Sequence, residues 1–235
     1  MVYNWLKNAR YLLYPGECRL CLSKALNGLE LCSQCLADLP TIDFACRSCA
    51  RPLSSGAGET CGKCLQSTPA ITRCFSLYAY QYPVDGIVQR IKFRRDLALI
   101  HSMGALMAKH IIDQNQAQAD VILPVPLHRK RLFTRGYNQS IELARPIQNA
   151  TGIPIDNTLC KRIIHTEAQS LLPASQRRKN IRGAFKIARK IDNTHIVIVD
   201  DVMSTGSTLN ELANALLKAG ARQVDAWVLA RSVFH

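Results

Sequence analysis

The chain has 235 residues and a formal net charge of +13, and aromatic residues make up only 6% of it. A chain of this length can bury a proper core, in one large domain or in two modest ones. No apolar stretch approaches the roughly 20 residues that a membrane-spanning helix needs, and the N-terminus has neither the apolar length nor the cleavage site of a signal peptide. We therefore expect a cytoplasmic protein without a membrane span.

The first predicted element is a short amphipathic helix at the N-terminus. Its apolar face would consist of Trp5, Leu6, Ala9, Leu12 and Leu13. This face would dock on the protein's own surface. The alternative is a helix that lies on a membrane surface.

Eight of the ten cysteines then form four Cys-x-x-Cys pairs, separated by ten, ten and eleven residues. Each pair can direct two thiolates at one ion, and two pairs complete a tetrahedral zinc site without an open position. Disulfides are the competing interpretation, but they do not persist in a reducing compartment. We therefore predict two structural zinc ions, whose pairs combine either in sequence order or in a cross-braced arrangement. The predicted ligands are Cys18, Cys21, Cys32, Cys35, Cys46, Cys49, Cys61 and Cys64.

The cysteine-rich part and the rest of the chain differ in charge. Residues 1–75 hold eight Lys or Arg against five Asp or Glu, a formal charge of +3, while residues 76–235 carry +10. Eight thiolates and two Zn²⁺ would bring the first part close to neutral. The basic clusters at 129–135 and 177–190 are either solvated surfaces or contacts for a polyanion.

A strand is predicted at residues 121–126, and a basic turn follows it. The turn reads Leu-His-Arg-Lys-Arg over residues 127–131, and Arg135-Gly-Tyr-Asn-Gln139 leads from it into a helix. A basic turn at a strand end could face the pyrophosphate of a bound ligand. His128 and His165 are interpreted as surface histidines rather than catalytic ones.

The connection over residues 161–185 is long, basic and without clean periodicity. A segment of about 25 such residues is more often functional or mobile than idle. We expect it to close over a bound ligand as a lid. Arg177 and Asn180 would make the closing contacts, and Arg162 would hold the hinge end.

A buried parallel strand is predicted at Ile196–Val199, which is β-branched and unbroken. The apolar spacing from Thr208 predicts a helix that ends near Gly220. Asp200 and Asp201 would therefore lie at the carboxyl end of the strand, the edge at which α/β sheets bind ligands.

Residues 203–207 would present backbone N–H groups and hydroxyls at a helix N-terminus, which suits a phosphate. The vicinal carboxylates before this turn suit the 2′ and 3′ hydroxyls of a ribose. The alternative is an ordinary polar strand end with a helix cap. Neither a Walker loop nor a dinucleotide-binding glycine pattern occurs in the chain.

Together these motifs resemble the ComF family over nearly the whole chain. The cysteine pairs are similar to its double zinc ribbon, and residues 80–93 to its linker and first helix, although Arg94-Arg95-Asp96 stands where Gly is common. Residues 124–139 are similar to its pyrophosphate-side loop and the next helix, and 162–180 to its flexible loop. Residues 200–208 match the loop of type I phosphoribosyltransferases that binds 5-phosphoribosyl 1-pyrophosphate (PRPP), with Ser204 in place of the usual Thr.

The resemblance implies an α/β fold. Residues 71–235 would form a type I phosphoribosyltransferase-like parallel sheet flanked by helices, and residues 1–70 a small Cys-rich double zinc ribbon with the N-terminal helix. The ligand would be PRPP or a ribose-5-phosphate-type molecule, bound with Mg²⁺. The implied catalytic residues are Asp200, Asp201, Arg162 and Arg177. The implied phosphate-binding residues are Met203, Ser204, Thr205, Gly206, Ser207, Thr208, His128, Arg129, Lys130 and Arg131.

The predicted reaction is displacement of pyrophosphate from PRPP by an acceptor that the sequence does not specify, linked to DNA uptake and competence or to nucleotide salvage. A second hypothesis is a non-catalytic adaptor that holds single-stranded DNA for competence or DNA-processing proteins. Stacking platforms for such a strand are scarce, and Phe133 and Tyr137 are the candidates. A third hypothesis is a regulator that senses PRPP.

Overall fold

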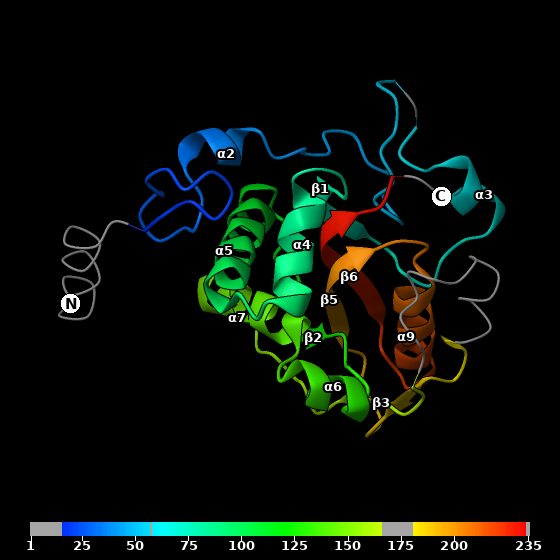
Figure 1. Cartoon of the computed structure of the whole chain (residues 1–235). Coiled ribbons are helices and arrows are strands. Elements are labelled where there is room, and N and C mark those ends of the chain that lie inside the picture. Colours follow the sequence, from blue (N-terminus) through cyan, green and yellow to red (C-terminus); the bar gives the residue numbers. More distant parts are fainter. Residues whose placement is uncertain (1–15, 57, 166–180, 234–235) are drawn as a thin grey trace.

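The computed structural model describes residues 16–56, 58–165 and 181–233. Its centre is a parallel sheet of four strands in the order β1-β6-β5-β2 (Figure 1). The strands are β1 (Cys74–Ala79), β6 (Gln223–Arg231), β5 (His195–Met203) and β2 (Val121–Pro124). In register, Val199 lies between Trp227 of β6 and Pro124 of β2.

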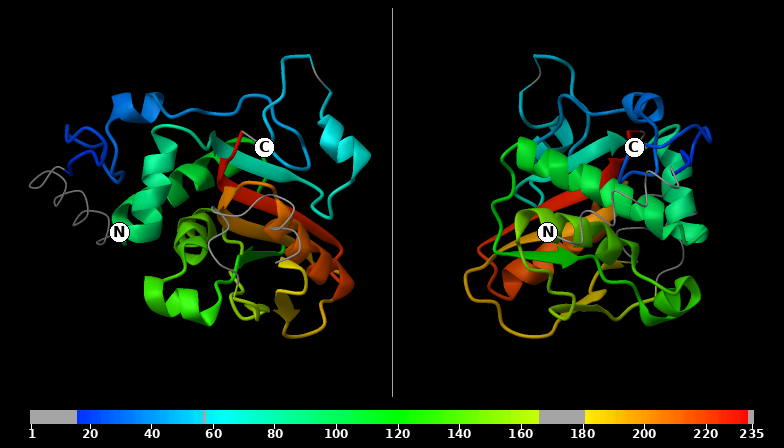
Figure 2. Two further views of the ribbon diagram at one scale, coloured as in Figure 1. Left: turned by 45° about the vertical axis from the view of Figure 1, so that its right-hand side comes forward. Right: turned by 90° about the vertical axis from the view of Figure 1, so that its left-hand side faces the viewer.

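Helices cover both faces of this sheet (Figures 1 and 2). One face packs against α4 (Val84–Phe93), α5 (Leu97–Asp113) and α7 (Gln139–Thr151), and the other against α9 (Ser207–Lys218). The side chains of β5 alternate between the two cores, because successive residues of a strand point to opposite faces. Val197 and Val199 lie in the first core, and Ile196 and Ile198 in the second. The predicted parallel sheet flanked by helices is confirmed.

The predicted basic turn is a helix. α6 comprises Arg129–Arg135. The His128 side chain caps its start by accepting a hydrogen bond from the backbone N–H of Lys130. Gly136 ends it with a left-handed φ of 82°. This difference from the sequence prediction decides which basic side chains face the site, as described below.

The strand of the phosphate-turn motif is longer than predicted. β5 continues through Asp200 and Asp201 to Met203, and the turn itself is confined to residues 204–206. Two short strands that were not predicted, β3 (Cys160–Arg162) and β4 (Phe185–Ile187), pair antiparallel at the two ends of the 161–185 connection. The N-terminal helix and the lid residues Arg177 and Asn180 lie outside the described residues.

The cysteine-rich part is an internal repeat of two similar units. The bond from the Cys18 N–H to the Ser23 carbonyl has its counterpart at Cys46 and Arg51, and a short helix follows Cys32 just as one follows Cys61. These helices are α2 (Ser33–Ala37) and α3 (Gly62–Gln66).

The two units pack on the sheet rather than standing apart from it. Leu31 and Leu39 lie in the same core as α4 and α5, while the cysteines of the second unit lie in the core of α9. The N–H groups of Cys74 and Ala79 in β1 donate to carbonyls of this cysteine-rich part. The division at residue 70 stays a prediction. Within the described residues, no helix combines the length and apolar character needed to cross a bilayer.

Candidate phosphate-binding site

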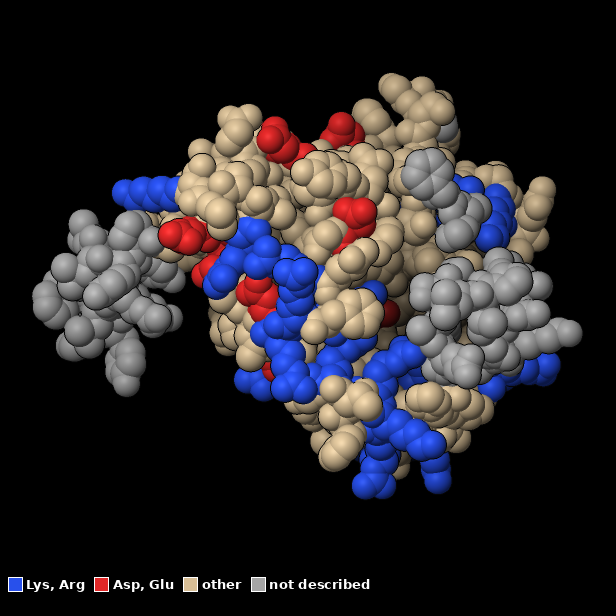
Figure 3. Space-filling view, viewed as in Figure 1, with Lys and Arg blue, Asp and Glu red and all other residues tan. Residues whose placement is uncertain are grey.

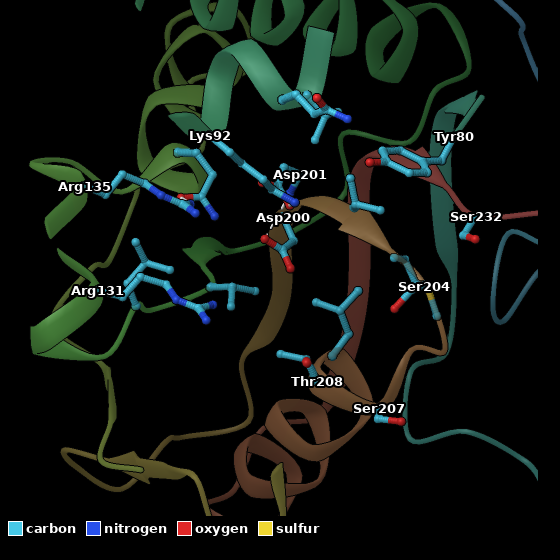
Figure 4. Close-up of a pocket in the computed structure, with 18 of the residues that line it drawn as sticks. Tyr80, Lys92, Arg131, Arg135, Asp200, Asp201, Ser204, Ser207, Thr208 and Ser232 are labelled. Carbon is cyan, nitrogen blue, oxygen red and sulfur yellow. Dashed lines mark hydrogen bonds and ion pairs between the residues drawn. The ribbon is translucent and has the colours of Figure 1, made fainter. Parts of the chain in front are cut away.

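A cavity of about 940 Å³ opens at the carboxyl end of the sheet, bordered by α4, α6 and the turn after β5 (Figure 4). Its volume lies in the range typical of small-molecule sites. The side chains of opposite charge and the hydroxyls that line it come from segments far apart in the sequence. Among them are Lys92, Arg95, Arg131, Arg135, Arg162, Asp200, Asp201, Ser204, Thr205, Ser207 and Thr208.

The two carboxylates are held by defined contacts. Asp200 Oδ1 accepts hydrogen bonds from Ser140 Oγ and from the N–H of Asp201, each at 2.9 Å. Ser140 is placed by Asn138, which caps α7 and also donates to the carbonyl of Val125, the residue that follows β2. The carboxylate orientation therefore depends on the start of α7 as well as on β5.

Asp201 has one oxygen in use and one available. Its Oδ1 lies 3.2 Å from the Nζ of Lys92, which reaches over from α4. Its Oδ2 is buried and has no hydrogen-bond partner among the described residues. Buried polar atoms are normally paired, so an orphaned acceptor at a cavity points to a ligand donor.

Burial, reinforced by the neighbouring Asp201 carboxylate, raises the pKa of Asp200 to about 7. Two adjacent carboxylates in a poorly solvated site cannot both ionise without cost. The Lys92 ammonium works against this rise. The pair is therefore poised to accept hydrogen bonds and to bind cationic partners that bring further stabilisation.

Cations crowd the opposite wall of the cavity. Burial and then the neighbouring Arg135 lower the pKa of Arg131, and burial and then Arg131 lower the pKa of Arg162. These guanidinium groups stay protonated at neutral pH, but they repel one another in a partly desolvated space. An anion bound among them would relieve that repulsion.

The turn after β5 supplies hydroxyls and backbone N–H groups. Gly206 has a left-handed φ of 80° and caps α9. The N–H of Ser207 donates to Thr205 Oγ1 at 3.3 Å, and the two hydroxyls lie 2.9 Å apart. Such a turn before a helix N-terminus suits an anion.

The structure brings most of the predicted site residues together. Arg131, Arg162, the two aspartates and all of residues 203–208 line the one cavity. His128, Arg129 and Lys130 are not part of its lining; His128 packs edge-on against His165, and the other two are exposed. Because α6 is a helix, Arg131 and Arg135 share a face four residues apart, and Arg129 and Lys130 point elsewhere.

Sequence reasoning did not single out Lys92, Arg95 or Ser140 as members of the site. Lys92 occurs in the last turn of α4, and its only signal was its place within residues 80–93, which resemble the linker and first helix of the family. Ser140 had one local signal, the capping residue Asn138 two positions before it. Its contact with Asp200 spans 60 residues of sequence and could not be read locally.

The cysteines form two groups of four in sequence order. The first group holds Cys18, Cys21, Cys32 and Cys35, the second Cys46, Cys49, Cys61 and Cys64, and the sulfurs in each lie within 4.8 Å of one another. Sulfur separations of 3.6 Å and 3.7 Å fit the edge of about 3.8 Å that follows from a tetrahedral Zn–S bond of about 2.3 Å. Two four-cysteine zinc-binding sites are thus formed, and the cross-braced alternative is excluded.

The chain resembles known proteins in both parts. Residues 9–65 match the family described as a double zinc ribbon domain, and residues 148–232 match the phosphoribosyl transferase domain. The chain is 33% identical over 227 residues to the DNA utilization protein YhgH of Salmonella typhimurium, covering 94% of this chain and 100% of that protein. It is also 33% identical over 223 residues to competence protein F of Haemophilus influenzae, covering 92% and 96%.

Among solved structures, the glutamine PRPP amidotransferase of B. subtilis complexed with ADP and GMP aligns with a TM-score of 0.40 and 23% identity, covering 60% of this chain and 30% of that one. The two domain matches confirm the expected combination of a double zinc ribbon with a phosphoribosyltransferase-type sheet.

Proposed function

This chain, a double zinc ribbon joined to a phosphoribosyltransferase domain, belongs to the ComF family, and we propose that its cavity binds PRPP. The observation that carries the proposal is the order of groups across the cavity. Asp200 and Asp201 lie between the cations of α4 and α6 on one side and the hydroxyls of Ser204, Ser207 and Thr208 on the other (Figure 4). PRPP carries a ribose between a 5′-phosphate and a 1-pyrophosphate, so its charges match this order.

In this pose the 5′-phosphate binds the turn at 204–206 and the first residues of α9, Ser207 and Thr208, and the ribose hydroxyls donate to the carboxylates. The orphaned Oδ2 of Asp201 is a suitable acceptor for one of them. Arg131, Arg135 and Lys92 face the pyrophosphate. The carboxylates also suit Mg²⁺, which prefers oxygen ligands and would supply positive charge toward the pyrophosphate.

The proposed reaction is transfer of the phosphoribosyl group to a nitrogen nucleophile. The acceptor bonds to C1 as the C1–O bond breaks, pyrophosphate leaves, and the acceptor nitrogen gives up a proton. Negative charge grows on the departing pyrophosphate, and fixed guanidinium groups stabilise it without reorganisation. The site residues thereby position the two reactants and stabilise the leaving group.

Calorimetric titration with PRPP and Mg²⁺ tests the binding step. The double variant Asp200→Asn, Asp201→Asn should lose affinity by about tenfold or more, because it weakens two charge-assisted hydrogen bonds. Asp113→Asn, an exposed aspartate in α5, is the control and should bind like the wild type. Equal affinities of wild type and double variant would contradict the proposal. Pyrophosphate release with a panel of nucleobases and amines then identifies the acceptor.

A second candidate function is binding of single-stranded DNA. Lys and Arg side chains form a band over α4 and α6 (Figure 3). Each of these two helices also carries an exposed aromatic residue, Phe93 in α4 and Phe133 in α6. Phe133 is 89% exposed and Phe93 76% exposed, and the Arg135 guanidinium lies 6.0 Å from the Phe93 ring centroid. Exposed rings in a basic surface suit stacking of unpaired bases. Tyr137 does not serve this role, because its hydroxyl bonds to the Ile91 carbonyl in the core.

Fluorescence anisotropy with a labelled oligonucleotide separates the two functions. Phe133→Ala should weaken strand binding without changing its salt dependence, whereas Arg129→Gln should reduce the slope by about 0.7. The double aspartate variant should bind the strand normally. If the double aspartate variant loses strand binding together with PRPP binding, the hypothesis of a separate DNA-binding surface is wrong.

The names of the relatives bear on the cellular role. We propose that this chain acts in the handling of DNA taken up by the cell, in the cytoplasm and with DNA-processing proteins as partners. The names competence protein F and DNA utilization protein YhgH support the link to DNA handling. Loss of DNA uptake in a deletion strain, restored by wild type and not by the double aspartate variant, would support a role that needs the ligand.

A further inference from the structure

Arg231 connects the second four-cysteine site to the turn that we assign to the 5′-phosphate. It is the last residue of β6 and is only 3% exposed. Its Nε donates to the carbonyl of Cys49 at 2.7 Å. Its Nη1 donates to the carbonyls of Met203, at 3.0 Å, and Ser204, at 2.5 Å. One side chain thus joins a zinc knuckle to both residues at which β5 enters the turn.

The charge of Arg231 also relates it to this zinc site. Among the described residues, no Asp or Glu forms an ion pair with it. All four cysteines of the second group are buried, and four thiolates with one Zn²⁺ carry two net negative charges. A buried charge without compensation is costly. The positive guanidinium of Arg231 and the negatively charged zinc–thiolate site beside it therefore compensate each other's buried charge. This compensation exists only while the metal is bound.

A second contact reinforces the connection. Cys74 Sγ lies 3.5 Å from Met203 Sδ, and both residues belong to the core that contains the second cysteine group. The end of the Met203 side chain fills the space beside Gly206, where an added Cβ would lie 2.5 Å from Met203 Cε. The inner side of the turn thus packs on the same region that Arg231 ties down.

We propose that Arg231 is a positioning residue through which zinc at the second four-cysteine site sets the conformation of the 204–206 turn. The inference rests on the proposed function, because it assigns the phosphate to this turn. Without the metal, the Cys49 knuckle loses its fixed shape and its negative charge. Arg231 then holds the turn less firmly, and phosphate affinity falls.

The first four-cysteine site offers an internal comparison. Arg90 Nη1 donates to the carbonyl of Arg19 at 2.7 Å, so this knuckle too is held by an arginine. That arginine belongs to α4 and also donates to Asp96, and none of its hydrogen bonds among the described residues reaches the turn. The two zinc sites should therefore differ in their influence on ligand binding.

The test compares Arg231→Met, Arg231→Lys and the control Arg90→Met in the full chain with two zinc ions bound. Arg231→Met should lose about tenfold in affinity for ribose 5-phosphate by calorimetry, the effect of one or two charge-assisted hydrogen bonds. Arg231→Lys should restore part of it, and Arg90→Met should match wild type. Hydrogen exchange of residues 203–208 in the absence of ligand should accelerate in Arg231→Met alone.

Zinc release to a chromogenic chelator gives a readout that needs no ligand. One of the two ions should leave faster in Arg231→Met than in wild type, whereas in Arg90→Met any faster release should leave exchange of the turn unchanged. Cys61→Ser, which opens the second site, should weaken ribose 5-phosphate binding, and adding Arg231→Met should cause no further loss. The coupling would be overturned if the losses of ribose 5-phosphate affinity from Cys61→Ser and Arg231→Met were additive. It would also be overturned if hydrogen exchange at residues 203–208 were unchanged in both single variants.

The outcomes also distinguish this inference from the proposed function. If wild type does not bind PRPP or ribose 5-phosphate at all, the proposed function fails. Exchange and zinc release would still report whether Arg231 couples the site to the turn. Should Arg231→Met fail to fold, Arg231→Lys and Cys61→Ser carry the same comparison.

Discussion

At the scale of single residues, the buried carboxyl of Asp200 works against folding while it serves the site. Its pKa in the folded protein is about 7, against an ordinary value of 3.8. The folded state therefore holds this proton more tightly than the unfolded state does. The stability that protonation provides is fully present below about pH 4 and is lost as the pH rises toward 7.

Asp200→Asn should therefore stabilise the protein in neutral solution. The amide remains neutral at every pH, and its oxygen can still accept from Ser140 and from the Asp201 N–H. The gain in stability is the free energy of unfolding of the variant minus that of wild type. We expect this gain to be about 2 kcal/mol larger near pH 8 than near pH 5. Urea denaturation at both pH values measures the difference. A variant less stable than wild type near pH 8 would mean that Asp200 is ionised at little cost.

Gly206 is the second residue with a sharp expectation. Its left-handed φ of 80° is unfavourable for any residue with a Cβ, and that Cβ would press on Met203. Gly206→Ala should cost about 1–2 kcal/mol of stability and also weaken ribose 5-phosphate binding. Gly56 is the matched control, since its φ is 83° and no described residue lies within 4 Å of an added Cβ. Gly56→Ala should lose stability without losing affinity for ribose 5-phosphate. If Gly206→Ala and Gly56→Ala bind ribose 5-phosphate equally well, the turn does not contact this ligand.

At the scale of elements, the site depends on how closely α7 approaches α5. A Cβ on Gly104 of α5 would meet the Leu143 carbonyl of α7 at 2.7 Å and the Pro146 ring at 2.9 Å. A backbone carbonyl cannot turn aside as a flexible side chain can. The position of α7 sets that of Ser140, and hence the hydrogen bond to Asp200.

Gly104→Ala should therefore destabilise the protein by about 1–3 kcal/mol through overpacking and should weaken PRPP binding. The control is Gly86→Ala in α4, where the described part of the chain places no atom within 4 Å of the added Cβ. That change should leave binding intact and raise stability slightly, because alanine favours a helix over glycine by about 0.5–1 kcal/mol. Thermal unfolding and calorimetry measure both effects. A neutral Gly104→Ala would show that the helices have room to separate.

The elements also show what local sequence could and could not predict. β5 and α9 were predictable, because a β-branched run and an apolar helical face are strong periodic signals. α6 has no buried residue, so its sequence lacks the regular spacing of apolar residues that predicts a helix. The only local signals for it are the capping residues at its two ends. Arg95 adopts a left-handed φ of 53°, and its guanidinium lies close to Gly136, 41 residues further along the chain. Such contacts between distant segments, like that of Lys92 with Asp201, leave no local pattern.

At the scale of the whole molecule, the zinc ribbons complete the sheet. β1 is an edge strand, and the side turned away from β6 would otherwise expose its N–H groups. Cys74 donates to the Arg47 carbonyl and Ala79 to the Pro40 carbonyl, so the cysteine-rich part covers that edge. Uncovered edges promote pairing between molecules. Metal binding therefore protects a strand of the other part of the chain.

Removal of zinc should consequently destabilise the sheet as well as the ribbons. With a chelator present, we expect release of two zinc ions per chain and a fall in the melting temperature by more than about 5 °C. Hydrogen exchange should accelerate at residues 74–79 of β1, which borders the ribbons, before it does at residues 207–218 of α9. Restoring zinc should restore both protections, and a metal-saturated sample carried through the same steps is the control. Unchanged exchange in β1 after both ions have left would mean that the ribbons fold beside the sheet without supporting it.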